Sequence, residues 1–128
     1  MADDYAKLEI RGIYSKNSDY SAPKVDFNPA NYAFRPDEYY HVEINCDTNG
    51  ETITTDLFRD GVTMIAVKNN DTSVNVLATF ATTGGTLTDM SIPAGSIMVM
   101  PDFNQTGNLS LKSASGTTVE CEVFIVGT

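Results

Sequence analysis

The feature that most constrains this chain is a ladder of short apolar segments between residues 62 and 128, each ended by turn residues. The segments follow one another at roughly 8–12-residue intervals, the spacing of an antiparallel sandwich or barrel. In most of them the apolar residues alternate with polar ones, so that one face of each strand is buried. VTMIAVKN at 62–69 is apolar on both faces, which predicts a central, covered strand. No segment has helical periodicity.

Residues 38–47 also alternate, and TNG at 48–50 supplies a turn before ETITTDLF at 51–58. These two segments therefore predict a hairpin. IPAG at 92–95 is expected to be a tight turn, because Pro93 cannot donate to a ladder and Gly95 permits a sharp bend. NLSLKSA and TTVECEVFIV predict a last hairpin that turns across Ser115 and Gly116.

The N-terminal part is less regular. Residues 5–14 alternate as a half-buried strand, which would tie the start of the chain into a sheet. Residues 15–37 contain three prolines and show no period, so we expect no regular element there. The length of 128 residues suits one domain. We divide it into an N-terminal strand and irregular arm (1–37) and a β-sandwich domain (38–128).

Residues 15–37 nevertheless carry several aromatic side chains, which a solvated linker rarely does. They either pack over one end of the sandwich or lie on a partner, where aromatic residues and Arg bury a large area at low entropic cost. Both interpretations remain open. The residues predicted to bind a partner are Tyr20, Phe27, Tyr32, Phe34, Arg35 and Tyr39.

The final strand predicts a second contact surface. In TTVECEVFIV, residues 119, 121, 123 and 125 would face the core and Glu120 and Glu122 the solvent. Phe124 and Val126 then interrupt the polar face with apolar side chains. We predict that they form an oligomer interface with another copy of the chain.

The charge balance excludes some partners. The formal net charge is −9, which disfavours nucleic acid, because binding needs Lys and Arg to displace counterions from phosphates. It equally disfavours an anionic membrane surface. The segment MADDYAKLEIRG has no basic and apolar leader pattern, so no export signal is expected. Cys46 and Cys121 are then expected to be free thiols in a reducing compartment, with a disulfide between them as the alternative.

The sequence offers little catalytic chemistry. His41 is the only histidine, so a three-histidine metal site is impossible within one chain and a base-assisted nucleophile would depend on this one residue. Glu120 and Glu122 are two residues apart on an outward face and are interpreted as solubilising. The loops at 47–51 and 69–71 resemble calcium-binding loops without the spacing of an EF-hand. We predict no catalytic residue, metal or cofactor, with a loop calcium as the alternative, and no small-molecule substrate.

Three segments carry a family resemblance: IAVKNNDTSVNVLATF, LTDMSIPAGSIMVMPDF and NLSLKSASGTTVECEVFIVGT. Residues 62–128, which contain them, resemble the small β-sandwich head decoration (cement) proteins of tailed bacteriophages. The resemblance implies a non-enzymatic virion protein on the capsid exterior, assembled in the host cytoplasm. It also implies binding to the major capsid protein, stabilisation of contacts between capsid subunits, and a homotrimer.

The sequence thus predicts an all-β, antiparallel β-sandwich, jelly-roll-like, with eight or nine strands and a long irregular N-terminal segment. Jelly-roll and immunoglobulin-like connections produce the same strand spacing, so the strand order is left open. Two other functions are kept as alternatives. One is a phage tail or fibre domain. The other is a carbohydrate-binding or adhesion module, against which the absence of tryptophan counts.

Overall fold

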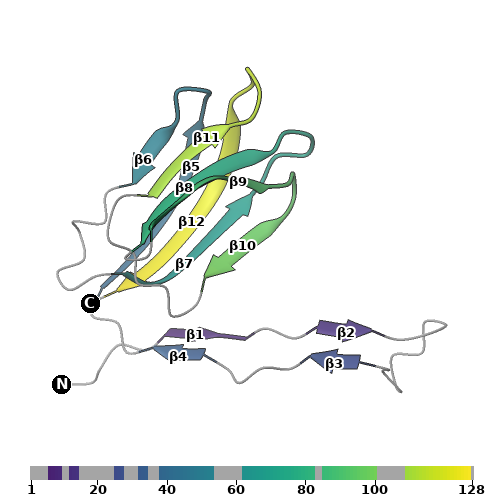
Figure 1. Cartoon of the computed structure of the whole chain (residues 1–128), viewed down its shortest axis with the longest axis vertical. Helices are drawn as coiled ribbons and strands as arrows, with labels where there is room; N and C mark the ends of the chain where they lie inside the picture. The colour runs from purple at the N-terminus through teal and green to yellow at the C-terminus, as the bar shows by residue number, and fades with distance from the viewer. Residues whose placement is uncertain are drawn as a thin grey trace.

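The computed structural model describes residues 6–9, 12–14, 25–27, 32–34, 38–53, 62–82, 85–100 and 109–127. These residues contain strands and turns and no helix, and two four-stranded antiparallel sheets face each other (Figure 1). The first sheet has the order β10 (Ile97–Met100), β7 (Val62–Asn69), β12 (Val119–Gly127), β5 (Glu38–Cys46). The second has the order β6 (Glu51–Ile53), β11 (Leu109–Ser113), β8 (Val76–Thr82), β9 (Gly85–Ile92). The predicted antiparallel β-sandwich is confirmed.

The strand pairs are nested along the chain. β8 pairs with β9, β7 with β10, β6 with β11, and β5 with β12, all antiparallel. The doubled chain then folds over on itself, so that the β7–β12 pairing joins two pairs into the first sheet and the β8–β11 pairing joins two into the second. This is the strand order of an eight-stranded jelly roll. It decides between the two connection patterns that the strand spacing left open.

Both predicted hairpins of the sandwich are wrong. β5 and β6 follow each other in sequence but lie in different sheets, and so do β11 and β12. At the first crossing the Asp47 carboxylate accepts hydrogen bonds from the backbone N–H groups of Asn49 and Gly50, at 2.8 and 3.1 Å. Gly50 has φ 86°, and a Cβ there would meet the Leu111 carbonyl oxygen at 3.2 Å. The turn chemistry was therefore identified correctly, but it bends the chain between sheets.

The second crossing is held by Ser113, which is buried. Its hydroxyl lies 2.9 and 2.6 Å from the carbonyl oxygens of Ser115 and Thr117 and accepts from the Ser115 N–H. The Ser113 N–H donates to the Asp47 carbonyl oxygen at 2.8 Å, so the two crossings are tied together at one end of the sandwich. Since these polar groups are satisfied locally, the chain can leave the sheet without orphaned donors.

The core fills the space between the sheets with branched aliphatic side chains and one large ring. The largest fully buried residues include Phe80, Ile65, Leu109, Leu111, Ile125, Val123 and Val119. Each contributes roughly 1.5–3 kcal/mol through burial. They come from alternate positions of β7, β8, β11 and β12, as the period-two pattern predicted. Met64 is buried and Met90 and Met98 pack against the core, so these methionines act as filler.

Asn69 is a polar residue inside this apolar core, with no exposed area. Its amide nitrogen donates to the carbonyl oxygens of Val74 and Ile92, at 2.9 and 3.0 Å. Its side-chain oxygen accepts from the Asp71 N–H at 3.0 Å, and its own N–H donates to the Ser96 carbonyl oxygen at 2.9 Å. One side chain thereby connects the end of β7 with the 70–75 turn and with the end of β9.

The N-terminal part forms a separate two-stranded ribbon (Figure 1). β1 (Ala6–Leu8) pairs with β4 (Tyr32–Phe34), and β2 (Gly12–Tyr14) with β3 (Val25–Phe27). The predicted single strand at 5–14 is therefore two short strands, and the prediction of no regular element in 15–37 is wrong. The three-residue strands fit between the prolines, which is why no period of useful length is visible. Among the described residues, no helix is long and apolar enough to cross a membrane.

We expect Asn69→Ala to lower the free energy of unfolding by about 3 kcal/mol, because two buried carbonyl groups and one N–H lose their partner. Urea denaturation monitored by circular dichroism measures the change. Asn70→Ala is the matched control, since Asn70 is exposed, and it should change stability by less than about 0.5 kcal/mol. Equal losses in the two variants would contradict the role given to Asn69.

Candidate functional site: an apolar groove on the outer face of the first sheet

The outer face of the first sheet is built from cross-strand rows that the register fixes. One row runs from Tyr39 on β5 to Val126 on β12 and Met64 on β7. The next row contains His41, Phe124, Ala66 and Val99, and the third contains Glu43, Glu122, Lys68 and Ile97. The face therefore changes from apolar to charged along the strands. Apart from His41, the side chains in the first two rows are apolar or aromatic, whereas a solvated sheet face normally carries polar residues.

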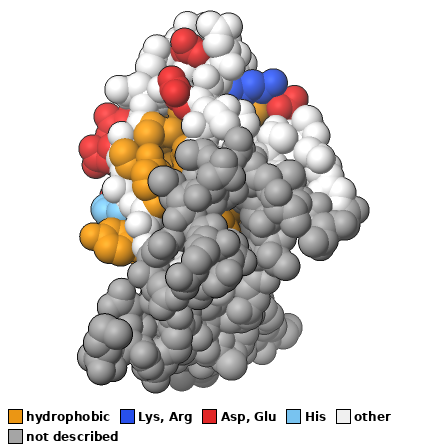
Figure 2. Space-filling view, turned by 90° about the vertical axis from the view of Figure 1, so that its left-hand side faces the viewer, with side chains coloured by type: hydrophobic (Ala, Val, Ile, Leu, Met, Phe, Trp, Pro, Cys, Tyr) orange, Lys and Arg blue, Asp and Glu red, His pale blue; other side chains and the backbone are white. Residues whose placement is uncertain are grey.

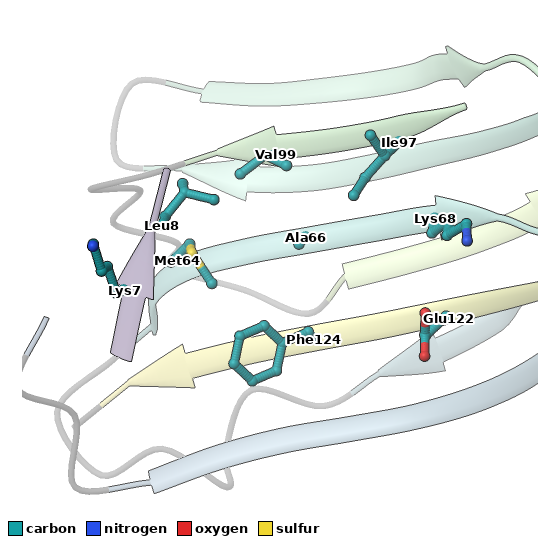
Figure 3. Close-up of a pocket in the computed structure, with 9 residues that line it drawn as sticks. All are labelled: Lys7, Leu8, Met64, Ala66, Lys68, Ile97, Val99, Glu122 and Phe124. Carbon is teal, nitrogen blue, oxygen red and sulfur yellow. The ribbon is translucent and has the colours of Figure 1, made fainter. Parts of the chain in front are cut away.

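A groove of about 280 Å³ lies on this face, between β1 and strands β7, β10 and β12 (Figure 3). Figure 3 shows its side chains standing on the sheet, with β1 crossing one end. The apolar lining comes from Leu8, Met64, Ala66, Ile97, Val99 and Phe124. Lys7, Lys68 and Glu122 complete the lining with charged groups. We call this feature the outer-face groove.

One end of the outer-face groove is covered by the chain itself. Leu8 on β1 and Phe124 pack against Met64 and Val126, which form a small cluster apart from the main core. Val126 is only 1% exposed and Phe124 is half-buried. The predicted oligomer interface at Phe124 and Val126 thus lies on the expected outer face, but there the N-terminal ribbon covers the Val126 side chain.

Large apolar side chains remain uncovered on the same face. Tyr39 is 73% exposed and Ile97 is 60% exposed. Isolated exposed apolar residues are ordinary, but Ile97 lines a hollowed apolar surface and Tyr39 lies on the same sheet face, an arrangement of the kind that marks an interaction site. Figure 2 shows hydrophobic, acidic and histidine side chains gathered along one border of the described surface.

The charged row is arranged around Glu122. His41 Nε2 lies 3.0 Å from Glu122 Oε2, and the His41 ring meets the Phe124 ring edge-on at a centroid distance of 6.0 Å. Glu43 is directly opposite Glu122 on β5, and Lys68 is opposite it on β7. Like charges opposite each other on a sheet repel, so Lys68, opposite Glu122 on β7, offsets the Glu43–Glu122 pair. The hydrogen bond to Glu122 leaves His41 beside a carboxylate at the surface.

The structure places the predicted partner-binding residues as follows. Tyr39 lies on the outer face and is exposed. The backbone of Phe27 is in β3, and the backbones of Tyr32 and Phe34 are in β4. Tyr20 and Arg35 lie outside the described residues. The prediction that these residues contact a partner stays a prediction.

Sequence reasoning missed the floor of the outer-face groove, at Ala66, Ile97 and Val99. A signal for it was present, because VTMIAVKN is apolar on both faces and one of those faces points away from the core. We interpreted that pattern only as coverage by the chain itself. SIMVM carries the same double-sided pattern at 96–100.

The two loops that resemble calcium sites use their carboxylates on the backbone. Asp47 accepts from Asn49 and Gly50, as described above. Asp71 Oδ1 accepts from the N–H groups of Ser73 and Val74, both at 2.8 Å. Within the described residues, no three His, Cys, Asp or Glu side chains cluster as a metal site would require. Both carboxylates are turn caps in this structure.

The hydrogen bonds to the Asp71 carboxylate lead to a prediction about how folding stability depends on pH. Hydrogen bonds from Ser73 and Val74 hold the pKa of Asp71 below its ordinary value of 3.8. A depressed pKa in the folded state stabilises the fold at neutral pH, and that stabilisation disappears as pH falls through the folded-state pKa, below 3.8. Asp71→Asn keeps the acceptor oxygen but cannot titrate. The variant should therefore be less stable than wild type at neutral pH, with the difference shrinking toward about pH 3.

Urea denaturation of both proteins at the two pH values checks this prediction. Ser73→Ala removes a hydroxyl 3.3 Å from Asp71 Oδ1 but leaves both backbone donors, so it should keep the acid dependence of the wild type. A stability difference between wild type and Asp71→Asn that stays constant with pH would contradict it.

No protein-family model and no curated protein matches the chain. Among solved structures, one similar chain is described by the words "Bacillus endospore appendages form a novel family of disulfide-linked pili". It is 15% identical, with a TM-score of 0.47, and the match covers 71% of this chain and 85% of that chain. This likeness is too low to carry an argument about fold or function. What the outer-face groove does must be argued from this chain's own residues.

Proposed function

We propose that this chain is a non-enzymatic structural protein that docks on another protein through the outer face of its first sheet. The observation that carries the proposal is the pair of exposed anchors on this face: Ile97, which lines the outer-face groove, and Tyr39, which lies on β5 opposite Val126. Interfaces draw most of their binding energy from a few large side chains that bury fully against a partner. The charged row, with Glu43, Glu122 and Lys68, supplies the polar rim that such interfaces have.

We further propose that the partner surface is the exterior of a phage head, where the chain acts as a capsid decoration protein. The family resemblance of residues 62–128 supports this choice of partner. In this role the chain binds the major capsid protein, stabilises contacts between its subunits, and assembles as a homotrimer. A net charge of −9 suits the outside of a particle whose inside holds DNA.

The N-terminal ribbon has a definite place in this proposal. It contacts the sandwich at Leu8 on β1, with β4 paired beside β1, and β2 and β3 continue the ribbon beyond that pair (Figure 1). A two-stranded ribbon alone is marginally stable in water. A partner that packs against it would add the buried area that it lacks. The ribbon would then contribute to the same contact as Tyr39, which lies at the start of β5, the next strand in sequence.

The chemistry available on the described residues supports a binding role. The chain's one histidine is engaged with Glu122 on a sheet surface, where no described serine or cysteine contacts it. Both cysteines are buried in the core. The outer-face groove is open and mainly apolar, which suits a side chain of a partner protein.

The test is binding of the purified protein to capsids assembled without it. We expect the double variant Tyr39→Ser/Ile97→Ser to bind at least about a hundredfold more weakly, because each lost anchor costs roughly 1.5–2 kcal/mol. Co-sedimentation at increasing protein concentration gives the Kd, and the capsid's melting temperature reports the loss of stabilisation.

Leu87→Ser is the matched control. Leu87 is 41% exposed but lies on β9, in the other sheet, so its loss should leave the Kd within about threefold of wild type. If the wild-type protein does not bind capsids, the proposal that the capsid is the partner is wrong. If it binds and the double variant binds equally well, the proposal that the outer face of the first sheet is the docking face is wrong. If sedimentation equilibrium shows a monomer at micromolar concentration, the proposed homotrimer is wrong.

A further inference from the structure

The turn between β5 and β6 contains the one Asn-Gly pair of the chain, Asn49–Gly50. Such a pair is prone to deamidation, because glycine has no side chain to block attack of its backbone nitrogen on the preceding carboxamide. Asn49 is exposed, and its backbone N–H is hydrogen-bonded. Its side-chain carboxamide makes no hydrogen bond to any residue that the structure describes. The carboxamide is therefore free to turn toward the Gly50 nitrogen.

The other asparagines among the described residues lack this combination of features. Asn69 and Asn75 hold their carboxamides in hydrogen bonds to other parts of the chain. Asn45 and Asn70 are exposed, but each precedes a residue with a side chain, a cysteine and an aspartate respectively. Asn49 is thus the asparagine of this set in which both reacting groups are least hindered.

The Asp47 carboxylate holds the nitrogen that would attack. The Gly50 N–H donates to Asp47 Oδ1 at 3.1 Å and to the Asp47 carbonyl oxygen at 3.3 Å. The Asn49 N–H donates to the same carboxylate oxygen at 2.8 Å. A backbone nitrogen attacks only when it gives up its proton, and a charged acceptor stabilises the protonated N–H. The Gly50 nitrogen must therefore leave the Asp47 carboxylate before it can react.

We propose that Asn49 is a site of deamidation and that the Asp47 carboxylate slows the reaction. The Gly50 nitrogen loses its proton and attacks Asn49 Cγ, the Cγ–Nδ2 bond breaks, and the leaving nitrogen takes up a proton to become ammonia. Water then opens the resulting cyclic imide at either of its carbonyl carbons. One opening gives aspartate, and the other gives isoaspartate, in which the main chain runs through the former side chain. One water is consumed and one ammonia released, with no oxidation or reduction.

The isoaspartate product adds an atom to the main chain at a closely packed place. A Cβ on Gly50 would lie 3.2 Å from the Leu111 carbonyl oxygen and 3.3 Å from Lys112 Cβ, so the backbone there packs against β11. The next residue, Glu51, begins β6, which has three residues and pairs only with β11 among the described strands. The longer main chain therefore displaces this short edge strand. The aspartate product adds a charge beside Asp47 but keeps the length of the main chain.

The experiment incubates the folded protein at mildly alkaline pH and follows the intact mass, which rises by about 1 Da when one amide becomes an acid. We expect tandem mass spectrometry to locate the change at Asn49 and isoaspartyl methyltransferase to label the product. Asp47→Ala should speed the reaction about tenfold, because the Gly50 N–H loses a hydrogen bond to a charged acceptor. Asp47→Asn keeps a neutral acceptor and should speed it less. Circular dichroism checks that both variants are folded.

Asp71→Ala is the matched control, because it removes the corresponding carboxylate from the turn after β7. It should leave the rate at Asn49 within about twofold of wild type, and Asn49→Gln should show no mass gain at position 49. Wild type that stays unmodified at Asn49, or an Asp47→Ala rate no higher than that of wild type, would overturn the proposal. Equal acceleration by Asp71→Ala would also overturn it, because general loss of stability would then control the rate.

The displacement of β6 has a separate test. Anion exchange isolates the isoaspartate product, and Asn49→Asp supplies the same added charge without the longer main chain. The isoaspartate product should melt roughly 4 °C below Asn49→Asp. Equal melting temperatures would contradict the displacement. Both tests are independent of the proposed docking function, because residues 47–51 do not line the outer-face groove.

Discussion

The sandwich depends on one strand, β12, which hydrogen-bonds on both sides within the first sheet. It pairs with all nine residues of β5 and with β7. Its inner side chains from Val119 to Ile125 are fully buried against the second sheet. Loss of β12 would therefore detach the edge strand β5, divide the first sheet, and expose the core from one side. Of its outer positions, Phe124 and Glu122 line the outer-face groove, and Glu122 is the centre of the charged row. Fold and candidate site thus depend on the same nine residues.

Within the sandwich, local chemistry in the sequence was sufficient to predict strands, turns and inward faces, but insufficient to predict pairing. TNG and IPAG are turns, and Gly50 and Gly95 take the positive φ values that those turns need. Yet turn residues indicate only that the chain changes direction. The same Asx turn at Asp47 is compatible with a hairpin and with a crossing between sheets. Which one forms depends on Ser113 and its bond to the Asp47 carbonyl oxygen, and residues 48–112 separate these two positions. No local pattern contains that information.

The candidate site was harder to predict for a related reason. Tyr39 was among the residues predicted to bind a partner, and it is exposed on this face. Ile97 and Val99 were missed because a segment that is apolar on both faces looks equally apolar whether its second face meets the core, a ribbon or a partner. The outer-face groove exists because Leu8 covers only one end of that second face. Its boundary is set by where a three-residue strand crosses the sheet, and strands that short leave no periodic signal.

The nested pairing of the strands has a consequence for how the chain acquires its structure. β8 and β9 are joined by a short connection, so they can pair first at little cost in loop-closure entropy. Once they have paired, β7 and β10 are brought close, and each completed pair shortens the effective loop for the next pair outward. The strand pairs can thus form in order from the middle of the chain outward. β5 comes last, because it has no partner within its sheet until residues 119–127 have been made. On a ribosome, the alternating strand at 38–46, with Tyr40, Val42 and Ile44 on its inner face, would wait unpaired while residues 47–118 are synthesised. The fold therefore forms after synthesis of β12, and the interval before that is when this chain is most exposed to aggregation.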